Sequence, residues 1–146
     1  HEPWKNPYAM SKYSMEQLDH NNAVGLRFTT VYGPGAKKDM LIPKILNNDV
    51  SYLNINHIRD FIHVNDVANA VEVMIKVTFR GVVDVGTGIS NKLVDIADYF
   101  KIDYKSVIGD ETERLDNTAD TSILNRFGWR AKINLYNYIE ENRNVN

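Results

Sequence analysis

The feature that most constrains this chain is an alternation of short apolar runs with segments of helical periodicity. The stretches Val24–Tyr32, Phe61–Val64 and Val82–Val85 are rich in β-branched and aromatic residues, which predicts strands. Apolar side chains then recur at i, i+3, i+4, i+7 and i+8 from Val67 to Ile75, which predicts a helix packed on a sheet. Strands that alternate with helices predict an α/β fold with at least partly parallel pairing.

Further elements follow the same alternation. The spacing predicts two more short strands, Ser51–Ile55 and Tyr104–Ile108, with Asn65, Ser90 and Asp120 as helix N-caps. The other expected helices run over Tyr8–Asp19, Met40–Leu46, the segment after Ser90, the turn after Asp120 and Leu135–Asn142.

The predicted sheet is small for a chain of 146 residues. Two or three central strands bury little apolar surface, and their edges leave backbone groups without partners. We therefore expect another stretch of polypeptide to cover one edge of this sheet.

Composition excludes several classes of protein. The 17 basic and 19 acidic side chains leave a net charge of −2, which argues against a nucleic-acid partner. There is no cysteine, so disulfides and thiolate metal sites are excluded, and the His and carboxylate residues lack metal-ligand spacing. No apolar run approaches the ~20 residues of a membrane helix. We expect a cytoplasmic protein without a metal or membrane partner.

Tyr8 is followed four residues later by Lys12 on a predicted helix, where positions i and i+4 share a face. A phenol with an ordinary pKa of about 10 is a poor base at neutral pH, but a nearby ammonium stabilises the phenolate. The pair is therefore a candidate general base with its activating cation. In the alternative interpretation, Tyr8 packs locally and Lys12 is only solvated.

Five motifs follow one another along the chain. They are Asn-Pro-Tyr8-Ala-Met-Ser-Lys12, Gly25-Leu-Arg27-Phe-Thr-Thr-Val-Tyr-Gly33-Pro34, Arg59-Asp60-Phe-Ile-His63-Val-Asn-Asp66, Val83-Asp84-Val85-Gly86-Thr87-Gly88 and Ala119-Asp120 through Trp129. In this order and spacing they resemble the extended short-chain dehydrogenase/reductases, specifically the C-terminal half of NAD-dependent nucleotide-sugar epimerases and dehydratases. The UDP-glucuronate and UDP-glucose 4-epimerase-like members are the most similar, and the resemblance covers essentially the whole chain.

The resemblance implies an incomplete Rossmann-like fold. Residues of about 1–35 and 60–90 would form the C-terminal strands of the Rossmann domain. Residues of about 36–59 and 91–146 would form a small substrate-binding lobe interleaved with it, within a single unit.

The resemblance also assigns candidate site residues. Tyr8 would take a proton from a sugar hydroxyl while hydride passes to NAD, and Lys12 would hold the nicotinamide ribose. Thr30 would line the pocket of a nucleotide-diphosphate sugar. Arg59 would bind the diphosphate, with Arg114 as a second candidate. The alternative for Arg59 is a structural ion pair with an acid such as Asp60.

Other polar residues are expected to be structural. A lone His63 at a strand end and Asp66 in a first helical turn are typical of hydrogen-bonded core and helix-dipole roles. Gly86-Thr87-Gly88 imitates the start of a dinucleotide fingerprint, but the third glycine is replaced by Asn91. We do not expect this turn to bind a cofactor.

The glycine-rich NAD-binding segment of the family is expected outside this chain, in a missing N-terminal half. Two functions stay open. The first is a nucleotide-sugar epimerase that is active only with that half, and the second is an inactive nucleotide-sugar-binding or oligomerisation module. In the family, the helix that bears the tyrosine forms a dimer contact, so the resemblance implies a homodimer.

Overall fold

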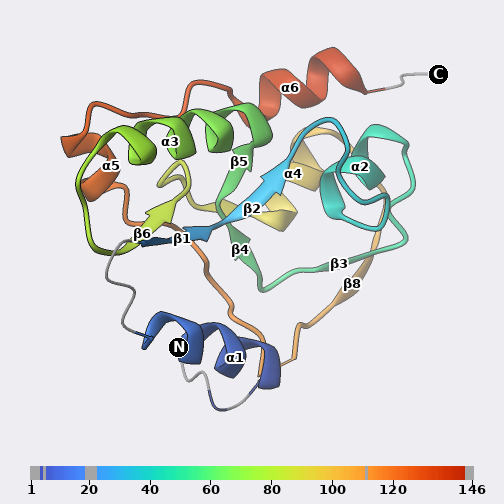
Figure 1. Ribbon diagram of the computed structural model, residues 1–146. Coiled ribbons are helices and arrows are strands. Elements are labelled where there is room, and N and C mark those ends of the chain that lie inside the picture. The colour runs from blue at the N-terminus through green and yellow to red at the C-terminus, as the bar shows by residue number, and fades with distance from the viewer. Residues whose placement is uncertain (1–3, 5, 19–22, 111, 144–146) are drawn as a thin grey trace.

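The computed structural model describes residues 4, 6–18, 23–110 and 112–143, and alternating helices and strands make up this part (Figure 1). The helices are α1 Pro7–Glu16, α2 Leu41–Leu46, α3 Val64–Lys76, α4 Leu93–Tyr99, α5 Ser122–Arg126 and α6 Leu135–Asn142. The strands are β1 Val24–Phe28, β2 Thr30–Tyr32, β3 Tyr52–Asn54, β4 Ile58–Arg59, β5 Phe61–His63, β6 Gly81–Val85, β7 Asn91–Lys92 and β8 Lys105–Val107.

Parallel pairing dominates the sheets. β1 pairs with β6, β2 with β5 and β3 with β8, all in parallel, whereas the short β4 and β7 pair antiparallel. α3 lies between β5 and β6 in the chain and so forms part of the long connection from β1 to its parallel partner β6. The predicted α/β class with a Rossmann-like arrangement is therefore confirmed.

The stretch Val24–Tyr32 is two strands, so the prediction of one continuous strand is wrong. The break falls at Thr29, whose N–H donates to the carbonyl of Val85, the last residue of β6. The next N–H, that of Thr30, donates instead to the carbonyl of Asp60, which precedes β5. The chain changes its pairing partner between these two residues, and nothing in the local residue pattern marks that change.

Two apolar cores lie on either side of this change of partner. One packs α3 and α5 onto β1 and β6 and includes Ala70, Met74, Val83 and Leu124. The other gathers around α2, α4 and α6 and includes Tyr32, Ile45, Phe61, Ile96 and Ile139. The division into a Rossmann part and a substrate lobe, with the boundaries given above, remains a prediction.

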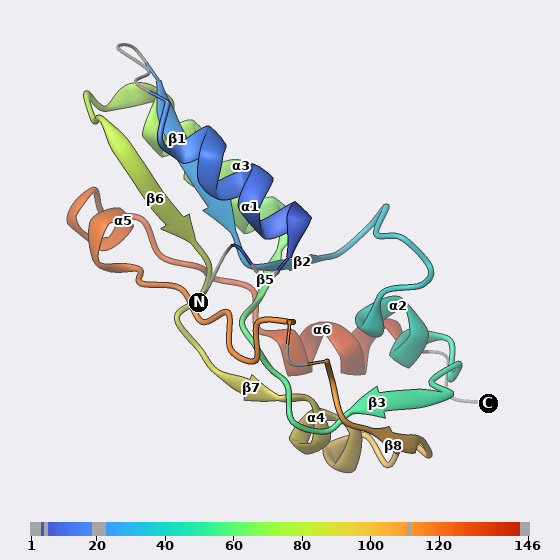
Figure 2. The same ribbon diagram turned by 90° about the horizontal axis from the view of Figure 1, so that it is seen from below.

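α1 lies on the face of the β1–β6 pair opposite α3 (Figures 1 and 2). None of its residues is buried within the described structure. Its attachment is polar, because the guanidinium of Arg27 on β1 donates to both carboxylate oxygens of Glu16, at 2.7 and 2.6 Å. This hydrogen-bonded pair holds the pKa of Glu16 below its usual range. The C-terminal end of α1 is thereby fixed to the sheet.

Helix ends were predicted with mixed success. α6 has the predicted bounds, with Asn134 accepting from the N–H groups of Tyr136 and Asn137. α3 begins two residues earlier than expected because its N-cap is His63 rather than Asn65. Ser90 does not cap α4, since its hydroxyl bonds to Thr118 and α4 begins at Leu93. Asp19, the predicted end of the first helix, lies outside the described residues.

Across the described ranges, no helix has the length and apolar character needed to cross a bilayer.

Candidate functional site

The predicted pair Tyr8 and Lys12 shares one face of α1. Asn6 caps this helix by accepting from the N–H groups of Tyr8 and Ala9, and Pro7 opens its first turn. The Lys12 ammonium lies 5.4 Å from the centroid of the Tyr8 ring. Tyr8 is 71% exposed, so the pair faces outward from this chain. The ammonium can stabilise negative charge on the phenol oxygen once another stretch of polypeptide covers the pair and excludes water from it.

α1 runs antiparallel to β1, which brings the N-terminal end of α1 under the end of β1 where β2 begins (Figures 1 and 2). In parallel α/β sheets, ligands bind at the carboxyl ends of the strands. The helix therefore presents Tyr8 at the end of the sheet where such a ligand is expected.

An open groove of about 570 Å³ lies at the carboxyl end of β2 and is lined by residues 29–37, Met40 and Val64. The predicted Thr30 is in its wall. The Thr30 hydroxyl accepts a hydrogen bond from the side-chain amide of Asn117, at 3.0 Å. Asn117 in turn accepts from the N–H of Asp60, at 2.8 Å, and so fixes the groove wall to the start of β5.

Asp60 organises the junction of the two strand pairs, a role that the sequence did not indicate. Its carboxylate is fully buried. It accepts from the N–H and hydroxyl of Thr87 and from the N–H groups of Gly88 and Ala119, at 2.6 to 3.2 Å. Within the described residues, the partners of this carboxylate are therefore backbone N–H groups and a hydroxyl, and not Arg59.

The turn Gly86-Thr87-Gly88 is confirmed as a structural turn. In dinucleotide-binding loops such N–H groups point at the phosphates. Here the N–H groups of Thr87 and Gly88 are already donated to Asp60. A Cβ on Gly86 would lie 2.5 Å from Asp60 Oδ2, so glycine is required at this position.

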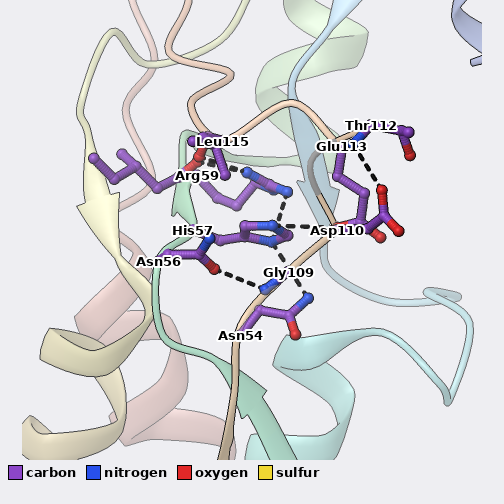
Figure 3. Close-up of polar contacts among 10 residues, drawn as sticks. Asn54, Asn56, His57, Arg59, Gly109, Asp110, Thr112, Glu113 and Leu115 are labelled. Atoms are coloured by element: carbon purple, nitrogen blue, oxygen red, sulfur yellow. Dashed lines mark hydrogen bonds and ion pairs between the residues drawn. The ribbon is translucent and has the colours of Figure 1, made fainter. Parts of the chain in front are cut away.

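The two predicted arginines lie in one neighbourhood. Arg59 Nη1 donates to the carbonyls of Ile58 and Leu115 (Figure 3). Arg114 Nε donates to the carbonyl of Asp116. Burial lowers the pKa of Arg59, an effect that Glu113 opposes and Arg114 reinforces. Within the described part of the chain, neither arginine contacts Tyr8 or Lys12 directly. The assignment of both to a diphosphate remains a prediction.

His63 and Asp66 have the structural roles that were expected. His63 Nδ1 accepts from the N–H of Asn65, and its ring packs edge-on against Tyr32. Asp66 accepts from the N–H groups of Lys132 and Ile133 and so anchors the segment before α6.

Two buried imidazoles, His63 and His57 in the turn between β3 and β4, should make the fold pH-dependent. Burial lowers the pKa of both His57 and His63, because the folded state disfavours their charged forms. The stabilisation that comes with the neutral imidazoles is complete above the ordinary pKa of about 6.5 and is lost as pH falls from there through the lowered folded pKa values. We expect the free energy of unfolding in urea to decrease between about pH 6.5 and pH 5. The double variant His57→Asn/His63→Asn should show a smaller decrease, and an unchanged slope would contradict this assignment.

Residues 2–86 match the NAD dependent epimerase/dehydratase family, which is more than half of the chain. The chain is 30% identical over 142 residues to CDP-abequose synthase of Salmonella muenchen, covering 86% of this chain and 48% of that protein. It is 35% identical over 82 residues to Protein CapI of Staphylococcus aureus, covering 47% of this chain and 25% of that protein.

Solved structures share the fold. MoeE5 in complex with UDP-glucose and NAD superposes with a TM-score of 0.78 at 24% identity, over 94% of this chain and 54% of MoeE5. UDP-N-acetylglucosamine 4-epimerase from Methanobrevibacter ruminantium M1 superposes with a TM-score of 0.74 at 24% identity, over 94% of this chain and 52% of the epimerase. The chain spans about half the length of the first of its curated relatives. With its parallel α/β fold and its Tyr8–Lys12 helix, this chain belongs to the NAD dependent epimerase/dehydratase family.

Proposed function

We propose that this chain supplies the catalytic helix and the nucleotide-sugar site of an NAD-dependent nucleotide-sugar epimerase acting on a UDP-sugar. The observation that carries the proposal is the Lys12 ammonium over the ring of Tyr8, on the exposed face of α1. The family match supports the reaction class, and the groove at Thr30 supports a bound sugar nucleotide.

In this proposal Tyr8 removes the proton from a sugar hydroxyl as the carbon that carries it is oxidised. Lys12 stabilises the phenolate form of Tyr8 that acts as the base, and it holds the nicotinamide ribose. Bound NAD would supply the hydride acceptor and, for epimerisation, the hydride donor. Tyr8 then returns its proton to the sugar oxygen, so the enzyme ends the cycle in its starting protonation state.

Tyr8 and Lys12 fit the reactive end of NAD, because they offer a hydroxyl and an ammonium. Gly86-Thr87-Gly88 resembles a phosphate-binding loop, but its N–H groups at Thr87 and Gly88 already donate to the carboxylate of Asp60. We therefore assign the diphosphate end of NAD to an N-terminal half, in the same chain or another, that would extend the β1–β6 pair. That half would also enclose Tyr8 and exclude water from it.

Arg59 and Arg114 are proposed to bind the diphosphate of the sugar nucleotide, with Thr30 in the groove at the carboxyl end of β2. A guanidinium matches phosphate oxygens in charge and geometry. We expect Arg59→Ala to weaken the binding of UDP by at least about tenfold, measured by titration calorimetry at low salt. Arg80→Ala removes an exposed guanidinium just before β6 and is the matched control.

Equal UDP affinity of the Arg59→Ala and Arg80→Ala variants would remove Arg59 from the site. A chain that binds uridine and UDP with the same affinity would contradict the diphosphate site altogether.

One observation favours the second candidate, a non-catalytic binding or oligomerisation module. Apolar side chains gather on the exposed helix α1 and just before it, including Trp4, Met10, Tyr13 and Met15. Such a surface is typical of an interface.

We propose that this apolar surface forms a homodimer of a cytoplasmic protein, whether the chain is part of an enzyme or a non-catalytic module. Turnover by the chain together with its NAD-binding half supports the enzyme, and UDP binding without turnover supports the module.

A further inference from the structure

His57 is a buried histidine in the turn between β3 and β4, and the proposed mechanism does not use it. Only 3% of its surface is exposed. Its carbonyl accepts from the N–H of Leu93, which holds the turn against α4. On the other side, a Cβ on Gly109 would overlap with His57 Nε2, so the backbone of the segment after β8 packs directly on the imidazole.

The contacts of His57 determine its tautomer. Nδ1 lies 2.9 Å from Arg59 Nη2 and 3.4 Å from the side-chain nitrogen of Asn54 (Figure 3). A guanidinium nitrogen and an amide nitrogen are both donors only, so Nδ1 must be the acceptor. The proton of the neutral ring is then on Nε2, which lies 3.2 Å from Glu113 Oε2 but off the line of a hydrogen bond.

His57 is the third acceptor that fixes the orientation of the Arg59 guanidinium. Nη1 donates to the carbonyls of Ile58 and Leu115, and Nη2 donates to His57. Of the five N–H bonds of an arginine, three are therefore used by the described residues. The N–H on Nε and one on Nη2 remain for another acceptor, and the guanidinium cannot turn without losing these contacts.

We propose that His57 is a positioning residue that presents the Arg59 guanidinium to the diphosphate of a sugar nucleotide, an inference that rests on the function proposed above. His57 acts through its unprotonated Nδ1. Protonation would place a second donor and a like charge 2.9 Å from Arg59 Nη2, so the guanidinium would lose its fixed orientation.

The charges around His57 set the direction of this pH dependence. Burial and the charge of Arg59 on β4 lower its pKa, whereas Glu113 raises it. In the same segment, Arg114 and Asp116 act on Arg59 with opposite signs. Neutral His57 is therefore the form present at pH 7, and acid is expected to weaken diphosphate binding.

The test compares two variants of matched size in the 146-residue chain. His57→Asn keeps an oxygen acceptor near the position of Nδ1, whereas His57→Leu has the same shape without an acceptor. UDP is the probe, and uridine reports any general damage to the site. We expect UDP affinity to fall about tenfold in His57→Leu and to be restored in His57→Asn, with uridine affinity unchanged in both.

A pH profile and a tautomer measurement complete the test. Between about pH 7.5 and pH 5, UDP affinity should fall more for the wild-type chain than for His57→Asn. The phosphate of UDP titrates identically in both measurements, so the difference reports His57. Nitrogen chemical shifts should report the Nε2–H tautomer of His57 at neutral pH.

The measurements distinguish failure of the His57 role from failure of the proposed diphosphate site. Equal UDP affinity of wild type, His57→Asn and His57→Leu, together with weaker binding by Arg59→Ala, overturns the role of His57 and leaves the diphosphate site intact. No UDP binding by the wild-type chain overturns the diphosphate site and this inference together. A proton on His57 Nδ1 at pH 7 also overturns the inference.

Discussion

Replacing Tyr8 by Phe is expected to lower kcat by about 10³-fold while leaving the affinity for UDP unchanged. The phenol oxygen is the only group that the substitution removes, and in the proposed reaction it carries the proton from the sugar hydroxyl. The ring and its contact with Lys12 are kept. Turnover should be measured on a panel of UDP-sugars, with NAD and the NAD-binding half present.

Tyr13 provides the matched control because it is an exposed tyrosine on the same helix. Tyr13→Phe should keep kcat within about twofold of wild type. If Tyr8→Phe and Tyr13→Phe lost activity equally, the effect would belong to the helix surface and not to the chemistry. If Tyr8→Phe kept most of its activity, Tyr8 would not be the base.

The largest effect on stability is expected at Asp60. The isosteric Asp60→Asn places a donor NH₂ among the buried N–H groups of Thr87, Gly88 and Ala119 and removes the charge that they stabilise. Hydrogen bonds to a charged acceptor contribute about 1.5–3 kcal/mol each, and leaving a buried donor without a partner costs about 1–3 kcal/mol. We expect the free energy of unfolding in urea to fall by about 3 kcal/mol or more. That is a large part of the total for a domain of this size.

Asp98→Asn is the control for this substitution, because Asp98 is exposed on α4. It should change the free energy of unfolding by less than about 0.5 kcal/mol.

Gly86→Ala tests the same junction without changing a charged residue. Its Cβ would lie 2.5 Å from Asp60 Oδ2 and 2.6 Å from the Ala119 Cβ, so we expect destabilisation of the same order as Asp60→Asn. A near-neutral Asp60→Asn would show that the carboxylate is not the centre of the junction.

The strand pattern illustrates how far local reasoning extends. Val82–Val85 was predicted as a strand from its apolar run, and β6 extends it by Gly81 alone. The same reasoning joined β1 and β2 into one strand, because residues 24–32 show no local break. The separation at Thr29 depends on which strand lies alongside, and that partner is far away in the sequence.

The sequence by itself determined whatever depends on neighbours along one helix or strand. The period of the α-helix places Tyr8 and Lys12 on one face, and the bounds of α6 follow from its local pattern, so both could be predicted. The tertiary structure alone decided the roles of Asp60 and His57. Asp60 meets Thr87 and Ala119 from 27 and 59 residues away, and His57 is enclosed by the backbone at Gly109. A single sequence holds no record of such distances, because they are set by how the strands pair and the layers pack.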